Sequence, residues 1–267
     1  WQFDDFYEYG QFANGDYFVV ANNDSGFVNI TMITPKVQGE FNGWMVNMNS
    51  TIQAYDSRAS GYNQEKIPNL PYLAKPYDSI IKSVSIKPFN QTIRPPLKTT
   101  AVITILEKFP ENGGGEFFRP AFFGKHKPLY SIKNINKSLI PSMKPPKGYF
   151  PNQIDWMNDR FKMMQLDVDS YPGEFIRAND NFCLGVGGHA CSYGGRVAIW
   201  NGDGALTLML NFSYEDKEKP LIYYLQMGLD LYHIMKANMT WEPNGGHGSG
   251  RKLPIIFTEI ILENKTI

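Results

Sequence analysis

The spacing of apolar residues changes partway along this chain, and that change constrains the fold more than any other feature. In residues 80–87, Val84 and Ile86 alternate with serine and lysine residues, and other short stretches before residue 110 show similar alternation. A period of two is typical of half-buried β-strands. After residue 152 the apolar residues recur every three or four positions, which is typical of amphipathic helices. The sequence therefore predicts strands first and helices afterwards.

The expected strands are short and are separated by Gly, Pro and Asn residues. We expect them at residues 17–21, 27–34, 51–55, 80–87 and 99–106. Strands of this length and spacing favour an antiparallel β-sandwich. Residues 107–150 are expected to be irregular, because three successive glycines and six prolines interrupt them.

The expected helices occupy the last third of the chain. They cover residues 152–164, 204–211 together with part of 196–200, 219–237 and 252–262. Gly228 leaves room for a close neighbour, and Pro254 is expected in the first turn of the last helix. Either earlier segments cover the last two helices, or this region is one piece of a longer helical domain.

These patterns predict an α+β chain with an antiparallel β-sandwich followed by a helical part. We expect a β-rich domain at residues 1–136, a Pro-rich linker at 137–151 and a helical domain at 152–267.

Charge and motif content exclude several classes of function. The 26 Lys and Arg residues are balanced by 26 Asp and Glu residues, so the chain lacks the basic surplus of nucleic-acid-binding proteins. No apolar run reaches the roughly 18 residues of a membrane span. The chain contains no Gly-x-Ser-x-Gly elbow, His-Glu-x-x-His motif or dinucleotide fingerprint. We therefore expect no nucleic-acid partner, no membrane span, no cofactor and no metal.

The sequence also indicates a compartment. Asn-x-Ser/Thr glycosylation sequons occur at Asn23, Asn29, Asn49, Asn90, Asn136, Asn211, Asn238 and Asn264. The chain opens on Trp1 instead of Met, which suggests that an earlier segment was removed. Together these features predict a secreted or cell-surface glycoprotein. The alternatives are a chain merely rich in Asn, Ser and Thr, and a first residue unrelated to processing.

The two cysteines lie on either side of a glycine-rich segment. Cys183 and Cys191 are close enough in sequence to form a disulfide, the expected state in an oxidising compartment. Metal binding by both cysteines with His189 is the alternative, although no fourth ligand lies nearby and the spacing is unlike common zinc sites.

The sharpest candidate site is the glycine-rich segment at residues 241–252. His247 lies among glycines at a helix entrance, where we expect it to be accessible as an acid or base. Arg251 and Lys252 would bind a carboxylate, sulfate or phosphate, with Asn244 nearby as a substrate ligand. The alternative is a tight interhelical loop in which His247 caps a backbone group.

Two further groups of polar residues are weaker candidates. Tyr232 lies on the helix whose Gln226, Asp230 and His233 share one stripe; the alternative for that stripe is a solvated face. Tyr193 and Arg196, with His189, have the chemistry of sugar stacking and carboxylate binding. The alternative there is a disulfide-stapled turn.

Residues 117–120 and 125–127 combine aromatic and basic side chains. We expect them to serve in packing between domains, with their charges solvated.

Four segments carry a resemblance to a known group of proteins. They are residues 9–17 (YGQFANGDY), 41–47 (FNGWMVN), 118–120 (FRP) and 244–252 (NGGHGSGRK). The chain resembles large, mostly uncharacterised secreted proteins of environmental bacteria, over nearly its whole length. The resemblance implies a β-sandwich followed by a helical domain like the α/α toroid of polysaccharide lyases. It also implies that such proteins continue beyond the point where this chain ends.

Two hypotheses about function follow. In the first, the protein is carbohydrate-active, a lyase or hydrolase on an acidic polysaccharide. Arg251 and Lys252 would then neutralise a uronate carboxylate while His247 or Tyr232 removes the neighbouring proton. In the second, it is a non-catalytic structural or adhesive glycoprotein that self-associates, or that joins a second chain cut from the same precursor.

Overall fold

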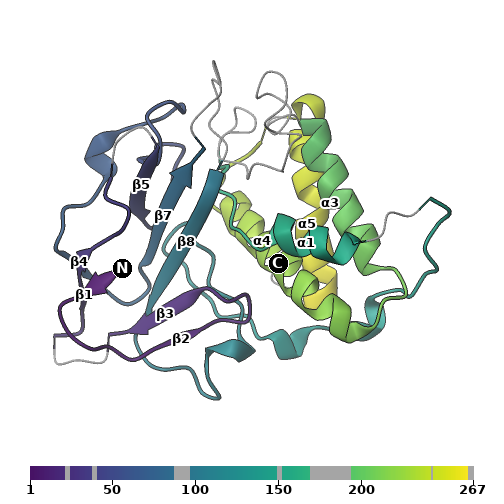
Figure 1. Ribbon diagram of the computed structural model, residues 1–267, viewed down its shortest axis with the longest axis horizontal. Coiled ribbons are helices and arrows are strands. Elements are labelled where there is room, and N and C mark those ends of the chain that lie inside the picture. The colour runs from purple at the N-terminus through teal and green to yellow at the C-terminus, as the bar shows by residue number, and fades with distance from the viewer. Residues whose placement is uncertain are drawn as a thin grey trace.

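The fold is mixed α+β, with the sheets on one side of the molecule and the long helices on the other (Figure 1). The computed structural model describes residues 1–21, 25–37, 41–86, 97–148, 152–168, 194–241 and 243–263. Within these residues, no helix is both long enough and apolar enough to cross a lipid bilayer.

The described strands form two sheets. The smaller sheet has the order β1 (Gln2–Phe3), β4 (Val28–Met32), β6 (Tyr72–Ala74). The larger has the order β2 (Tyr9–Gln11), β3 (Tyr17–Val20), β8 (Leu97–Leu106), β7 (Ser79–Ser85), β5 (Asn42–Val46). The strands predicted near β3, β4, β7 and β8 are confirmed.

The five-stranded sheet is the middle layer. One face packs on the three-stranded sheet, where Ile80 and Ile103 share a cluster with Val28 and Ile30 of β4. The other face carries Ile81 and Val102, which are buried in a cluster with connecting segments and with Ile234 of the helical part. A strand buried on both faces needs apolar residues throughout, which explains the β-branched run of β8.

Four helices of at least two turns follow in the described part. They are α1 (Gln153–Phe161), α3 (Gly194–Leu208), α4 (Tyr214–Lys236) and α5 (His247–Leu262). Short 3₁₀ turns connect the elements at Gln64–Lys66, Gly114–Glu116, Ile132–Asn134, Lys137–Leu139 and Asn244–Gly246. The helices share a core in which Tyr224 lies between the rings of Phe161 and Phe257.

Several sequence predictions about these elements are wrong. β3 pairs with β8 in parallel, so the larger sheet is mixed and not purely antiparallel. No strand forms at residues 51–55, because the Gln53 side chain folds this stretch into a compact turn. Its Nε2 donates to the carbonyl oxygens of Asp56, Ala59 and Ser60, and its Oε1 accepts from the backbone N–H groups of Tyr55 and Asp56.

Two helices begin earlier than predicted. α4 begins at Tyr214, because the Ser213 Oγ accepts a hydrogen bond from the Asp216 N–H and caps the first turn. α5 begins at His247, so Pro254 lies inside the helix and not in its first turn.

A close contact between α4 and α5 depends on Gly228, as predicted. A Cβ atom at Gly228 would lie 2.0 Å from the Thr258 Oγ1 and 2.5 Å from the Pro254 carbonyl oxygen, both on α5. A Cβ atom at Gly202 in α3 would meet nothing within 4 Å.

We expect Gly228→Ala to lower the free energy of unfolding by about 1–3 kcal/mol, the usual cost of overpacking. The matched control, Gly202→Ala, should raise it by about 0.5–1 kcal/mol, because alanine favours a helix interior. Urea denaturation of both variants checks this. Equal midpoints for the two variants would contradict the close α4–α5 contact.

Candidate functional site

The first turn of α5 brings two predicted site residues together. His247 and Arg251 are four positions apart, which places them on the same helix face. The Arg251 Nη1 donates to the His247 carbonyl oxygen at 3.0 Å and lies 3.2 Å from the His247 Nδ1. The sequence grouped these two residues in one site, and the contact between them follows from the earlier start of α5.

This pair is buried. His247 is 3% exposed and Arg251 is 2% exposed, so the prediction of an accessible His247 is wrong. The Arg251 guanidinium is held on one side by the Asp167 carboxylate, which it meets through Nη2. The guanidinium also lies over the Trp241 ring, with 5.1 Å between the Arg251 Cζ and the ring centroid. The Trp241 Nε1 also donates to the Asp167 carbonyl oxygen at 3.1 Å, so Trp241 contacts both members of the Arg251–Asp167 ion pair.

The glycines around this group serve helix packing. A Cβ atom at Gly194 would lie 2.6 Å from the Gly245 carbonyl oxygen, and one at Gly250 would lie 2.8 Å from the Ala198 backbone. Gly245 and Gly246 have positive φ, which glycine adopts without strain. The glycines therefore let α3 approach the start of α5, whereas the sequence suggested that they let a ligand approach.

The other predicted site residues lie apart from this pair or outside the described residues. Lys252 is exposed on α5, Arg196 is half-buried on α3, and Tyr232 is buried on α4 with its ring 5.2 Å from that of His233. Asn244 lies in the 3₁₀ turn before α5. The positions outside the described residues are Cys183, His189, Cys191 and Tyr193.

A groove of ≈ 380 Å³ runs beside α5 at the end of α4. Its wall is mostly apolar, with Arg251, Lys252 and Glu259 as its charged members. The lining residues are Met235, Met239, Thr240, Trp241, Gly248, Arg251, Lys252, Ile255, Ile256 and Glu259. Flexible methionine side chains are common on surfaces that bind other proteins. The groove therefore offers a surface beside Arg251 and Lys252 that another molecule could reach.

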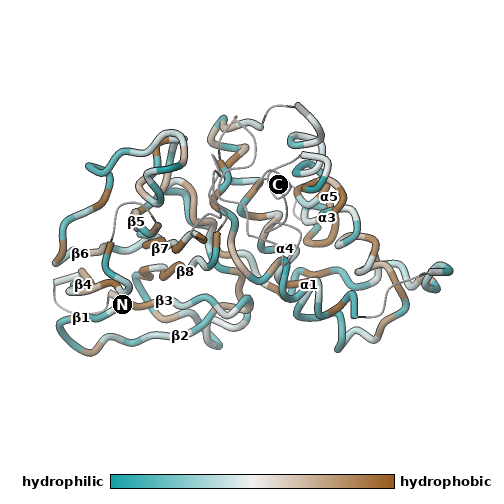
Figure 2. The backbone as a smooth tube through the Cα atoms, turned by 45° about the horizontal axis from the view of Figure 1, so that its top comes forward, coloured by the Kyte–Doolittle hydropathy of each residue, from teal (hydrophilic) through white to brown (hydrophobic). Residues whose placement is uncertain are grey.

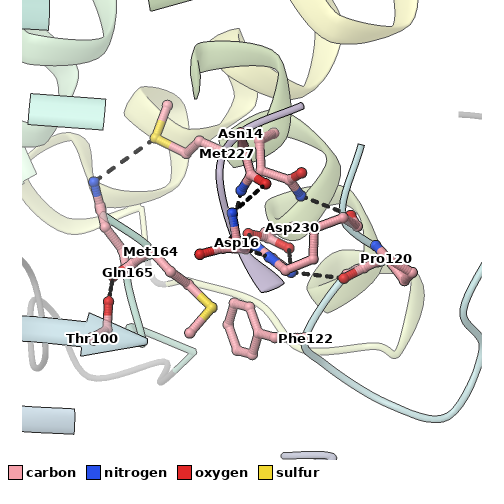
Figure 3. A network of polar contacts seen from close by, with 12 residues as sticks. Asn14, Asp16, Thr100, Pro120, Phe122, Met164, Gln165, Met227 and Asp230 are labelled. Atoms are coloured by element: carbon pink, nitrogen blue, oxygen red, sulfur yellow. Dashed lines mark hydrogen bonds and ion pairs between the residues drawn. The ribbon is translucent and has the colours of Figure 1, made fainter. Parts of the chain in front are cut away.

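A second buried charge cluster, centred on Arg119, joins the sheets to the helices. The Arg119 Nε donates to the Asp16 Oδ2 at 2.7 Å, and its Nη1 and Nη2 donate to the Asp230 carboxylate at 3.1 and 2.5 Å. Figure 3 shows Asp16 and Asp230 converging beside Asn14, whose Nδ2 also donates to the Asp16 Oδ2. Burial raises the pKa of Asp230, and the charge of Arg119 opposes that shift.

The polar stripe of α4 is confirmed as one face, but this face is not solvated. The Gln226 Nε2 donates to the Arg119 carbonyl oxygen at 3.0 Å, and the His233 Nε2 lies 3.2 Å from the Tyr130 hydroxyl. Burial, together with the nearby cations of His126, Lys127 and Lys236, lowers the pKa of His233 to about 4. His233 is therefore neutral near pH 7 and serves in packing.

The aromatic and basic segments pack between the sheets and the helices, as predicted, but their charges are only partly solvated. Arg119 and Lys127 are buried, whereas Lys125 and His126 are exposed. The Lys127 Nζ donates to the carbonyl oxygens of Ala121 and Phe122.

The cavity beside the Arg119 cluster is small. It measures ≈ 20 Å³ in the space open to the centre of a water molecule, which is room for about one water. The cavity is therefore too small for a substrate, and the Arg119 cluster serves to hold the structure together.

Five of the sequons lie in described residues. Asn49, Asn211 and Asn238 are exposed. Asn29 and Asn136 are half-buried, and their Nδ2 atoms donate to Asp4 and Glu263. Asn23, Asn90 and Asn264 lie outside the described residues.

No group of three or more His, Cys, Asp or Glu side chains in the described ranges is placed to hold a metal ion. Comparison of the chain with protein-family models, with curated proteins and with solved structures finds no match.

We expect Arg119→Met to lower the free energy of unfolding by about 3–5 kcal/mol, because it leaves Asp230 buried without its partner. The double variant Arg119→Met/Asp230→Leu should recover most of that loss, since an apolar pair carries no unpaired charge. Urea denaturation of wild type and the two variants measures both. A single variant as stable as wild type would show that Asp230 does not depend on Arg119.

Proposed function

We propose that this chain is a non-catalytic structural or adhesive protein of the extracellular space that self-associates through its helical part. The observation that carries the proposal is an apolar surface on the outer sides of α3 and α5. We call it the α3–α5 surface; its exposed apolar members are Ile199, Leu206, Leu253, Ile256 and Ile260. Figure 2 shows hydrophobic residues along both helices, which lie side by side.

Such a surface favours association. Clustered apolar residues rimmed by polar ones are characteristic of contact sites, whereas single exposed apolar residues are ordinary. The α3–α5 surface has five such residues on two packed helices, with Asp203 and Lys252 exposed among them. Covering them would remove a substantial apolar area from water.

The state of the predicted catalytic residues supports the same conclusion. Arg251 is tied to Asp167, and His247 lies buried against it. A general base must reach the proton that it removes. Neither His247 nor the buried Tyr232 has the exposure that this requires.

We also propose the finer architecture that the resemblance implies. The face-to-face contact of the two sheets supports a β-sandwich at residues 1–136, joined by residues 137–151 to a partial toroid-like helical domain at 152–267. The exposed sequons Asn49, Asn211 and Asn238 support a secreted or cell-surface location.

We expect the purified chain to gain mass with concentration in light scattering. Ile260→Glu, at a residue 53% exposed on α5, should shift the chain towards monomer. Leu73→Glu, at a residue 59% exposed on β6, is the matched control and should leave association unchanged. A monomer at every concentration would refute self-association. Equal association in both variants would refute the α3–α5 surface as the contact.

The second candidate is a carbohydrate-active protein that binds an acidic glycan or polysaccharide in the groove beside α5. The observation that favours it is the presence of Trp241, Arg251 and Lys252 in one wall. An aromatic ring next to cations has the chemistry to hold a sugar ring and its carboxylate. This reading requires the start of α5 to rearrange, so that Arg251 and Lys252 meet the carboxylate and His247 or Tyr232 reaches the proton as the base.

For this candidate, titration calorimetry with polyuronate oligosaccharides should show binding that weakens several-fold in Lys252→Gln. Lys219→Gln, at an exposed residue of α4, is the control. If the protein is also a lyase, unsaturated sugar products should form and should disappear in His247→Ala with folding unchanged. Absence of both binding and product would exclude this candidate.

A further inference from the structure

The exposed side of α5 carries a pattern of apolar and charged residues that indicates what kind of surface can pack against it. Leu253, Ile256 and Ile260 lie at positions i, i+3 and i+7 and are all exposed. This is the spacing of the apolar seam by which one helix packs along another. Four residues before Ile256 lies Lys252, and three residues after it lies Glu259, both along one flank of the seam.

The two flanking charges are free to pair with another molecule. Lys252 is exposed and Glu259 is half-buried, and both line the groove beside α5. They are seven residues apart, or about two helical turns, which is too far for them to pair with each other. Among the described residues, neither forms a salt bridge with another side chain.

We infer that the partner is a second copy of this chain, with the two α5 helices packed antiparallel about a two-fold axis at Ile256. This inference rests on the self-association proposed above and names its contact. About that axis, Lys252 of one copy lies beside Glu259 of the other, and the symmetry forms the same pair twice. In a parallel two-fold pair the flanks that carry these charges would lie on opposite sides of the seam, so Lys252 of one copy would meet neither Lys252 nor Glu259 of the other. Only the antiparallel pair brings the opposite charges together, and charge complementarity therefore favours it.

The groove extends this contact beyond α5. A stable dimer buries about 800 Å² on each partner, more than one helix seam supplies. Met235, Met239 and Trp241 form the wall of the groove next to the flank that carries Lys252 and Glu259. The second copy's α5 would cover this wall together with the seam, and Met235 is itself exposed and apolar.

Charge reversal tests the inference on the full chain. Lys252→Glu and Glu259→Lys each turn two attractive pairs into two repulsive ones, so each should weaken dimerisation about tenfold or more in sedimentation equilibrium. The double variant Lys252→Glu/Glu259→Lys rebuilds both pairs with their signs exchanged and should recover most of the lost affinity. Glu218→Lys, at an exposed residue of α4, is the control and should leave dimerisation unchanged.

The outcomes separate this inference from the proposed function. A wild-type chain that associates while the single variants do so equally well overturns the antiparallel α5 contact and leaves self-association standing. Single variants that weaken association with no recovery in the double variant also overturn the pairing. A monomeric wild type overturns both. Urea midpoints close to wild type in all variants show that each measurement reports association and not unfolding.

Discussion

The forked ion pair between Arg119 and Asp230 connects the two halves of this molecule. Arg119 lies in the segment after the sheets, Asp230 lies in the middle of α4, and Asp16 approaches from the start of β3. Because Arg119 is almost fully buried, its charge is tolerable only when the carboxylates are in place. The cluster therefore restricts how α4 can pack against the sheets. The phenylalanines at positions 117, 118, 122 and 123 lie in the same segment as Arg119.

Much of the fold could be predicted from the spacing of apolar residues. The alternation in residues 80–87 and the helical period near Leu221 and Leu225 each produced an element of the predicted type. β5 was missed because its Asn42-Gly43 start has the composition of a turn. Here Gly43 is needed because a Cβ atom would lie 1.7 Å from the Ala54 carbonyl oxygen. The sequence does not display such a contact between distant segments.

The sequence predicted that His247 and Arg251 belong to one site, but not how they are arranged or how deeply they are buried. The helix was expected to begin at residue 252, so the four-residue helical spacing of His247 and Arg251 exists only because α5 begins at His247. Their burial depends on Asp167 and Trp241, and Asp167 lies in a stretch with no periodic pattern to mark it. The glycines were recognised as a sign of close approach, but the approaching group is the backbone of α3. Gly194 of α3 lies against the start of α5, and Gly250 of α5 lies against Ala198 of α3. These two glycines were the sequence signal that could have predicted the packing of α3 on α5.

The position of β8 in the larger sheet affects how the chain folds. β8 lies between β3 and β7, and Tyr17 pairs with Ile103 in parallel register. The hairpin of β2 and β3 therefore has no neighbouring strand until synthesis has passed Leu106. Closing so long a loop has an entropic cost before the contact stabilises anything. During synthesis, the unpaired edge of β3 is thus exposed to other chains for longer than any hairpin edge formed by consecutive strands.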